Sequence, residues 1–375
     1  MFNKHNFLLL HCTYGFVFFN LLAAYVPSAS IIFVFLRDSW VFWLIYILLS
    51  TNHKISLHLL SFIAVFAFVG LLPVVERLTI LDATIYFYGF RDLCLIAMVV
   101  YFLVIRPKMN AGILYSFVWL NILAVAFEIY CSLVGIDTFR EIMRIDEYFN
   151  NKGVVTNLDR GLFGQRITGL LYAPALIAGL FTTLLWTDFR RLGKVSASLL
   201  GLATLSKAAP LIIGFYYFRR FWVVILIGVF ATQPLILGVT TVIKNQYPNT
   251  IYSFHAHSVS ERVFLNAFDE GDAELFPDAL GSSSVFAAVA KGEDSSVAPE
   301  SLLVSRIKDF NLLAIPFVLF LFFLAKQCQG HRDRFALFVS VCLLTGLSNH
   351  PVCWLPLLLH LGGQQRTAKH RPRTG

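Results

Sequence analysis

Long apolar runs dominate the chain and constrain its fold more than any other feature. Runs of about 20 apolar residues follow one another from Phe7 onward, separated by short connections, and about 20 such residues are needed to cross the hydrocarbon core of a bilayer. Of the 375 residues, 57% are hydrophobic and 14% are charged, whereas soluble domains carry about 25% charged residues. This composition excludes a disordered chain, a secreted disulfide scaffold and an ordinary cytosolic enzyme. It predicts an all-α, polytopic transmembrane bundle of about 10–12 membrane segments.

The short connections are basic, which predicts the orientation of the bundle. Arg106 and Lys108, Arg190 and Arg191, and Arg219 and Arg220 stand between apolar runs, and short basic connections mark the cytoplasmic face. The net charge of +8 is therefore spread along the chain rather than gathered on one face. A nucleic-acid partner would require a single basic surface, so we expect no nucleic acid and a multi-pass protein of the inner-membrane type.

With the basic connections inside, both long polar segments fall on the outer side. The predicted organisation is a single transmembrane domain over 1–361, a first periplasmic loop over 135–167, a large periplasmic loop over 244–309 and a basic cytoplasmic tail over 362–375. Loops longer than about 15 residues in a compact protein are usually functional or disordered. The two outer segments are therefore the first place to look for a site.

The expected spans are about ten, plus one broken pair. The second span follows Arg37 and Asp38 and ends near Leu49, and the fourth runs from near Ile85 or Arg91 to Ile105. The other spans cover about 7–26, 57–75, 111–134, 168–187, 221–243, 310–325, 335–348 and 351–361. The run 195–218 is flanked by basic pairs on both sides, so one crossing would violate the positive-inside rule. Two half-helices that break near Ser206, Lys207 and Pro210 restore the parity. Such breaks need surrounding protein or a water-filled cavity, which predicts a polar notch at Lys207.

The large loop carries two helix-start signals. Ser258 and Glu261 have the spacing of a capping box, which would place Arg262 in the first turn of a short helix. Pro299 suits the first position of another helix, with Glu300 in its first turn. We expect that second helix to run through Arg306 into the next span.

Arginines gather on the predicted outer side. They are Arg37, Arg77, Arg91, Arg140, Arg144, Arg160, Arg166, Arg262 and Arg306. Arg37, Arg91 and Arg166 adjoin apolar runs, where a charge costs roughly 2.5–3.5 kcal/mol on insertion scales. One interpretation is that each snorkels to lipid headgroups. The other is an anionic ligand in an outward cavity, because a guanidinium offers forked donors that match phosphate oxygens.

Candidate proton acceptors are few. His255 and His257 are the histidines of the two outer loops, and imidazole titrates near neutral pH and could deprotonate a sugar hydroxyl. Glu300 is the rival base. The alternatives are a solvated loop histidine and a helix-start carboxylate favoured by the dipole. Lys207 is either a phosphate contact or a snorkelling lysine.

Several motifs are missing from the sequence. It contains no GxxxxGK[ST], no HExxH, no CxxC among its six cysteines and no strict DxD in either long loop. ATP hydrolysis and metal-dependent nucleotide-sugar chemistry are therefore not expected, and no cofactor or metal is predicted.

Short stretches throughout the chain resemble the Wzy-type O-antigen and exopolysaccharide polymerases and their relatives, the O-antigen ligases. They are Leu36 to Trp40, Gly89 to Leu93, Arg166 to Gly169 with Ala173 and Pro174, Leu202 to Lys207, His257 and Ser258 with Arg262, Pro299 to Ser301, and Ser348 to Pro351 with Trp354. The resemblance implies a GT-C-like helical fold with a periplasm-facing cavity. It also implies a metal-independent, inverting transfer of a growing glycan from undecaprenyl diphosphate to the next lipid-linked repeat unit.

The resemblance also implies roles for individual residues. Arg166, Lys207, Arg262 and Arg91 would contact the diphosphate leaving group, and His257 or Glu300 would deprotonate the acceptor. Lys207 stands where the family often has arginine. The partners implied are undecaprenyl-diphosphate-linked oligosaccharide, membrane lipids and a chain-length regulator protein. Two alternatives stay open, an O-antigen ligase that transfers glycan to lipid A core and a membrane transporter or flippase, which usually has internal repeats and short loops.

Overall fold

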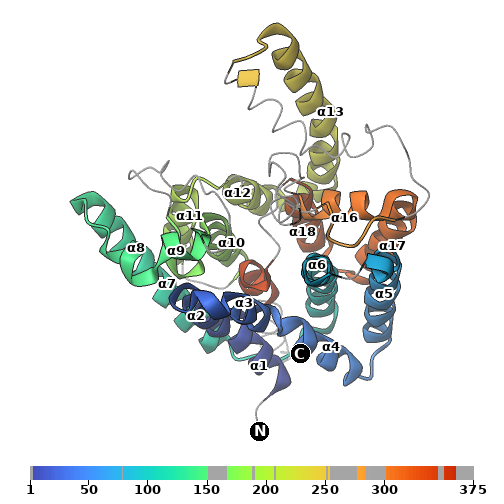
Figure 1. Ribbon diagram of the computed structural model, residues 1–375, viewed down its shortest axis with the longest axis horizontal. Coiled ribbons are helices and arrows are strands. Elements are labelled where there is room, and N and C mark those ends of the chain that lie inside the picture. The colour runs from blue at the N-terminus through green and yellow to red at the C-terminus, as the bar shows by residue number, and fades with distance from the viewer. Residues whose placement is uncertain are drawn as a thin grey trace, which may run out of the picture. The chain divides into compact units, whose positions relative to one another are not determined.

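The computed structural model is all-helical in the part of the chain that it describes (Figure 1). The described residues are 3–77, 79–150, 167–187, 191–206, 208–250, 252–253, 277–283, 287, 301–344 and 350–359. The chain divides into two compact units. Unit 1 comprises 1–53, 101–217 and 350–375, and unit 2 comprises 54–100 and 218–349.

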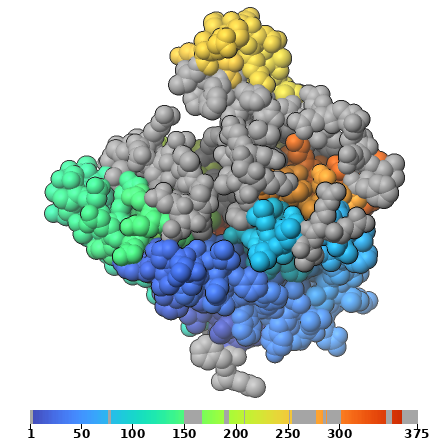
Figure 2. All heavy atoms as spheres, viewed as in Figure 1, coloured from blue at the N-terminus to red at the C-terminus, as the bar shows by residue number. Residues whose placement is uncertain are grey.

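Unit 1 is built around the first two apolar segments. Its helices are α1 (Lys4–Leu10), the π-helical turn η1 (His11–Gly15), α2 (Phe16–Tyr25), η2 (Pro27–Ala29), α3 (Ser30–Asp38), α4 (Trp40–Leu49), α7 (Ala111–Val134), α8 (Thr138–Met143), α9 (Ile145–Asn150), η4 (Gly169–Leu171), α10 (Pro174–Thr183), η5 (Leu184–Trp186), α11 (Arg191–Ala203), α12 (Ala208–Phe218) and η9 (Pro351–Cys353). Helix α2 packs along α3, and α10 along α11 (Figure 1). In the space-filling view, dark-blue atoms of the N-terminal part of the chain form part of the drawn face (Figure 2).

Unit 2 packs phenylalanine-rich helices together. Its helices are α5 (Lys54–Leu71), η3 (Leu72–Arg77), most of α6 (Ile80–Ile105), η6 (Arg219–Phe221, which begins one residue into this unit), α13 (Trp222–Gln246), α16 (Leu302–Phe310), η8 (Asn311–Leu313), α17 (Ala314–Gln327) and α18 (Arg332–Leu344). Phe62 of α5 stacks on Phe317 of α17 and Phe66 meets it edge-on, with ring centroids 5.9 and 5.2 Å away. These aromatic contacts bury large apolar area and hold α5 against α17.

Seven helices of the described residues are long and apolar enough to cross a membrane. They are Lys4–Tyr25, Pro27–Leu49, Lys54–Val75, Ile80–Ile105, Ala111–Val134, Ala208–Gln246 and Leu302–Gln327, with Pro174–Trp186 as a shorter apolar helix. Many of their large side chains, such as Ile31, Leu123 and Phe322, are exposed, which suits a lipid-facing surface. The predicted fold class, a polytopic helical membrane protein, is confirmed.

Two of the predicted spans begin earlier than expected. The second apolar helix starts at Pro27 rather than after Arg37 and Asp38, so both charges lie midway along it. The fourth starts at Ile80, so Arg91 lies inside the helix instead of at its start. In both helices an aspartate follows the arginine directly and pairs with it, which lowers the cost of placing charge in an apolar segment.

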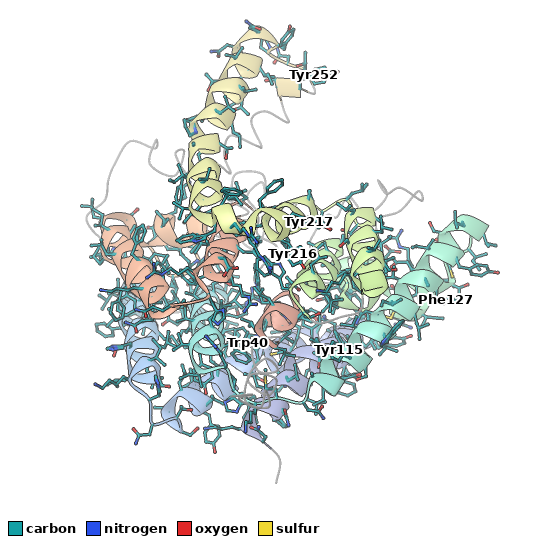
Figure 3. All side chains as sticks on the ribbon, turned by 180° about the vertical axis from the view of Figure 1, so that it is seen from behind. Trp40, Tyr115, Phe127, Tyr216, Tyr217 and Tyr252 are labelled. Atoms are coloured by element: carbon teal, nitrogen blue, oxygen red, sulfur yellow. The ribbon has the colours of Figure 1, made fainter. Side chains whose placement is uncertain are left out.

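The predicted helix break in the run 195–218 is present. Helix α11 ends at Ala203 and α12 begins at Ala208, with Leu205 between them in the left-handed region at φ 55°. Tyr216 of α12 packs edge-on against Trp186 of η5, with ring centroids 5.5 Å apart, and Lys194 of α11 lies 5.8 Å above the ring of Tyr216 (Figure 3). The two half-helices are therefore held together by side chains, while Lys207 itself lies outside the described residues.

The helix that follows the large polar segment starts later than predicted. We expected Pro299 at its first position, but α16 begins at Leu302. Ser301 is the N-cap because its Oγ accepts a hydrogen bond from Val304 N (3.2 Å) and donates one to Cys342 O of α18 (2.7 Å). A serine at this place satisfies an otherwise orphaned backbone donor, which fixes the start of the helix.

The six cysteines are all free and buried. Three lie inside the long apolar helices, namely Cys12, Cys94 and Cys131, and Cys342 lies in α18. Cys328 follows α17 directly, and burial raises the pKa of its thiol to about 12. These thiols act as small apolar side chains in the interior.

Candidate functional site

Five of the six predicted site residues lie outside the described residues: Arg166, Lys207, His257, Arg262 and Glu300. The sixth, Arg91, is described. For some of the other five, the structure shows how the neighbouring segments are held. Three polar clusters carry this information, one in unit 2 and two in unit 1.

Arg91 belongs to a buried cluster of four charged residues in unit 2. Its Nη2 lies 3.7 Å from Asp92 Oδ1, and its guanidinium lies 4.7 Å from the ring centre of Tyr88. Arg306 of α16 approaches the other carboxylate oxygen of Asp92 at 3.8 Å and pairs with Asp309 at 2.8 Å. Two arginines and two aspartates balance in charge, as buried ionic groups require.

Asp309 in this cluster binds a described piece of the large polar segment. Its carboxylate accepts hydrogen bonds from Gly281 N (2.8 Å), Ser283 N (2.9 Å) and Ser282 Oγ (3.2 Å). Leu280 N donates to Gly70 O at 3.0 Å. Residues 280–283 are thus fixed to α5 and α16 by four hydrogen bonds, of which three end on a buried charge and are about twice as strong as neutral ones.

Two glycines allow this close approach. Gly281 has φ 93°, a left-handed conformation that favours glycine. At Gly89 of α6 a Cβ atom would collide with Arg306 Nη1 and Leu280 Cγ. Gly89, two residues before Arg91, therefore makes room for the side chain of Arg306.

Glu128 of α7 holds the chain two residues after Arg166. Its carboxylate is buried in unit 1 and accepts hydrogen bonds from Thr168 N (3.0 Å to each oxygen), Thr168 Oγ1 (2.8 Å) and Gly169 N (2.8 Å). Gly169 has φ 52° and packs on Ile177 of α10. One carboxylate therefore fixes the backbone at the end of the first polar segment.

A second cluster of unit 1 holds the beginning of the same polar segment. Arg37 pairs with Asp38 through two bonds of 3.0 and 2.5 Å, and its Nη1 lies 3.2 Å from both Asn20 Oδ1 and Tyr148 Oη. Tyr148 also donates to Asn20 at 2.8 Å. Tyr148 lies on α9, so a buried arginine of the second apolar segment anchors the short helices that follow α7.

Aromatic side chains surround this second cluster. The ring centre of Phe16 lies 5.5 Å from the Arg37 guanidinium and 4.2 Å from the ring centre of His350. The ring of Trp40, labelled in Figure 3, meets the ring of His350 edge-on at a centroid distance of 6.3 Å. Cation–π contacts are stronger when desolvated. They stabilise the buried charge and hold His350, the N-cap of η9, against α2.

Sequence reasoning missed the acidic half of every cluster. It singled out Arg37, Arg91 and Arg306 but assigned no role to Asp38, Asp92, Asp309 or Glu128. The signal was present for two of them: the dipeptide Arg-Asp occurs at 37–38 and again at 91–92, each time next to an apolar run. A carboxylate beside an arginine in such a run indicates an internal ion pair rather than an arginine free for a ligand.

The described residues contain no group of three or more histidine, cysteine or acidic side chains that would suit a metal ion. The chain matches no protein-family profile, no curated protein sequence and no solved structure. What the chain does must therefore be argued from its own residues and from the short motifs described above.

Proposed function

We propose that this chain is a membrane polysaccharide polymerase, which transfers a growing glycan from undecaprenyl diphosphate to the next lipid-linked repeat unit at the periplasmic face. The observation that carries the proposal is the anchoring of both long polar segments. In unit 1, buried Arg37 contacts Tyr148 within the first segment and buried Glu128 holds Thr168 and Gly169 directly after it, and in unit 2 buried Asp309 holds residues 281–283 of the large segment. Burying a charge is costly unless it is paired and hydrogen-bonded, and a role in positioning reacting groups would explain why these segments are held by buried charges.

The proposed reaction needs cations on the leaving group and one base. A hydroxyl oxygen of the acceptor sugar attacks the anomeric carbon, the bond from that carbon to the diphosphate oxygen breaks, and the diphosphate leaves with the electron pair. Arg166, Lys207 and Arg262 would stabilise this developing charge. The acceptor proton passes to His257 or Glu300, and attack from the face opposite the leaving group inverts the anomeric carbon.

Arg91 takes a different place in this proposal. Its guanidinium is engaged by Asp92 and by the ring of Tyr88, and it lies in the cluster that holds residues 280–283. We therefore assign Arg91 a positioning role, in which it supports the large loop instead of touching the diphosphate.

Mass spectrometry of lipid-linked glycans tests the proposal. Cells that lack the gene should accumulate single repeat units on the lipid carrier, and the wild-type gene should clear them. Long chains left on the carrier would instead identify a ligase, and an unchanged glycolipid pool would identify a transporter or a scaffold. Either outcome overturns the polymerase.

Complementation with point variants tests the residues. Arg166→Ala and Arg262→Ala should each leave single repeats uncleared while the protein reaches normal levels. The glycan pool of cells with His257→Gln is compared with that of cells with His255→Gln, the matched control at the neighbouring histidine. The glycan pool of cells with Glu300→Gln is compared with those of both histidine variants. Full-length polymer from the two arginine variants would remove them from the site, and polymer from both His257→Gln and Glu300→Gln would remove the proposed base.

A further inference from the structure

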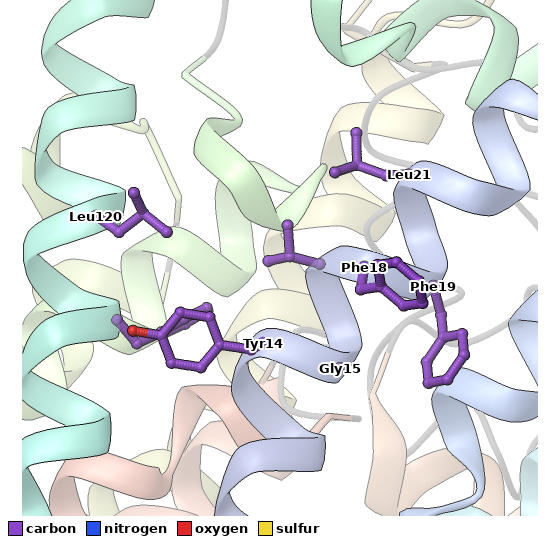
Figure 4. Close-up of a pocket in the computed structure, with 8 residues that line it drawn as sticks. Tyr14, Gly15, Phe18, Phe19, Leu21 and Leu120 are labelled. Carbon is purple, nitrogen blue, oxygen red and sulfur yellow. The ribbon is translucent and has the colours of Figure 1, made fainter.

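An apolar groove runs between the first apolar helix and α7 in unit 1 (Figure 4). Its volume is about 500 Å³, roughly three times the apolar cavity of about 150 Å³ that holds a benzene molecule. Side chains of both helices line it, among them Tyr14, Phe18 and Leu21 on one side and Phe117 and Leu120 on the other. Both walls are candidate membrane spans, so the groove opens toward lipid hydrocarbon.

The local backbone explains why the groove exists. Residues His11–Gly15 form a π-helical turn, which widens the helix at a single point and is frequent at functional sites. Gly15 ends this turn and lines the groove without a side chain. The three atoms nearest to a Cβ atom placed there belong to His11 and Leu10 of the same helix, at 3.5 to 3.7 Å, so a side chain at Gly15 would start in ordinary van der Waals contact.

The groove offers hydrocarbon contacts only. Among the side chains that line the groove, Tyr14 carries a polar group, its hydroxyl. This hydroxyl already forms a hydrogen bond of 2.8 Å with Ser116 Oγ of α7. The remaining lining atoms named above belong to phenylalanine and leucine side chains. A ligand that fits here is therefore an alkyl chain, because a sugar or a phosphate would lose its hydration without gaining a partner.

A cation stands at one end of the groove. Tyr14, Phe18, Leu21 and Tyr25 follow one another at helical spacing on one face of the helix, and Tyr25 lies about 6 Å beyond Leu21 along the axis. The guanidinium of Arg144 lies 4.5 Å from the ring centre of Tyr25, and the Tyr25 hydroxyl donates to Ile142 O at 2.8 Å. Arg144 is therefore held at Tyr25, one helical turn beyond Leu21, which lines the groove.

Arg144 has no ion-pair partner among the residues that the structure describes. By contrast, Arg140 on the same short helix pairs with Asp146 at 2.5 Å. Arg144 is also the left-handed C-cap of α8, with φ 47°, a conformation that costs energy for a residue other than glycine. A strained, partly exposed arginine stacked at the end of an apolar groove is suited to an anionic headgroup.

We propose that this groove is a binding site for one anionic membrane phospholipid, whose acyl chain lies against Gly15 and whose phosphate contacts Arg144. The occupant is a bilayer lipid rather than a reacting one, because the described residues that line the groove include no histidine and no carboxylate that could accept a proton. Asn20 and Phe16 of the same helix contact Arg37 and do not line the groove. The site is independent of the proposed glycan transfer.

Native mass spectrometry of the full-length protein tests this site. The purified chain is titrated with phosphatidylglycerol, phosphatidylcholine and a polyprenyl monophosphate, all with the protein in the same detergent. We expect one phosphatidylglycerol to be retained in preference to the other two. Preferred retention of the prenyl phosphate, or equal retention of phosphatidylglycerol and phosphatidylcholine, would overturn the proposal.

Matched variants separate the headgroup from the chain. Arg144→Gln should weaken phosphatidylglycerol binding about fivefold, the contribution of one cation near a membrane surface, and leave phosphatidylcholine unchanged. Arg140→Gln is the control and should have no effect, because Asp146 already neutralises that cation.

Gly15→Phe fills the groove and should abolish retention of both phospholipids. Leu120→Trp does the same from α7 if the first variant does not fold. Leu123→Trp, on an exposed part of α7 outside the groove, is the control and should bind as the wild type does. Unchanged binding in Arg144→Gln, or in a folded Gly15→Phe or Leu120→Trp, would refute the site.

Discussion

Replacing Glu128 by glutamine tests whether one buried carboxylate holds the end of the first polar segment. The wild-type side chain accepts hydrogen bonds from two backbone N–H groups and one hydroxyl, all within 3.0 Å. A glutamine keeps one acceptor oxygen and turns an NH₂ group toward a backbone donor. At least one buried N–H therefore loses its partner, and the bonds that remain are no longer charge-assisted.

The expected cost is about 2 kcal/mol, since a buried unpaired donor costs about 1–3 kcal/mol and the glutamine avoids part of the desolvation of the carboxylate. At 1.4 kcal/mol per factor of ten, the backbone at Thr168 and Gly169 should open about 30-fold more often. Hydrogen–deuterium exchange of a peptide spanning 167–172, measured with the protein in nanodiscs, reads this opening directly.

Asn121→Leu is the matched control for this experiment. Asn121 lies two turns before Glu128 on α7 and is also buried, but its side chain donates a hydrogen bond to Phe117 O of its own helix. Its replacement should leave exchange at 167–172 unchanged. If Glu128→Gln exchanges there no faster than Asn121→Leu, the carboxylate does not hold this segment and the anchoring argument fails.

Three further changes have defined outcomes in thermal unfolding of the detergent-solubilised protein. Gly89→Ala should destabilise it by about 1–3 kcal/mol, because the added methyl group overpacks the charged cluster, while Gly214→Ala, which meets open space, should not. Ser301→Ala removes an N-cap and should cost about 1 kcal/mol; an unchanged midpoint would contradict the assigned cap. Tyr148→Phe removes the hydroxyl that contacts Arg37 and should cost about 1–3 kcal/mol, and a stability equal to that of the wild type would show that this contact contributes nothing.

The helical membrane fold was predictable because it depends on composition and run length. The span 111–134 was predicted with its observed bounds, since Asn110 caps its start and Gly135, at φ 74°, ends it. The break between α11 and α12 was also predictable, because the basic pairs on both sides left no room for a single crossing.

The contacts inside the clusters were not predictable in the same way. Arg306 and Asp92, like Glu128 and Thr168, are far apart in the sequence and are brought into contact by tertiary packing. Such contacts leave no periodic pattern in the sequence. The start of α16 was misplaced for a related reason. Pro299 is a local signal for a helix start, but the start is set by a serine whose hydroxyl also bonds to Cys342 of another helix, and tertiary contacts override local preference.

Because every native thiol is buried, the wild-type chain should react little with a thiol-labelling reagent, so new cysteines can be introduced into it directly. Reaction with a maleimide needs an accessible thiolate, and the six cysteines are at most 3% exposed, with the pKa of Cys328 raised to about 12. A cysteine introduced in place of His255 or Lys369 would therefore be the site that a membrane-impermeant reagent modifies in intact cells. Sidedness of the large polar segment and of the basic tail is open to direct chemical mapping without first removing a single native cysteine.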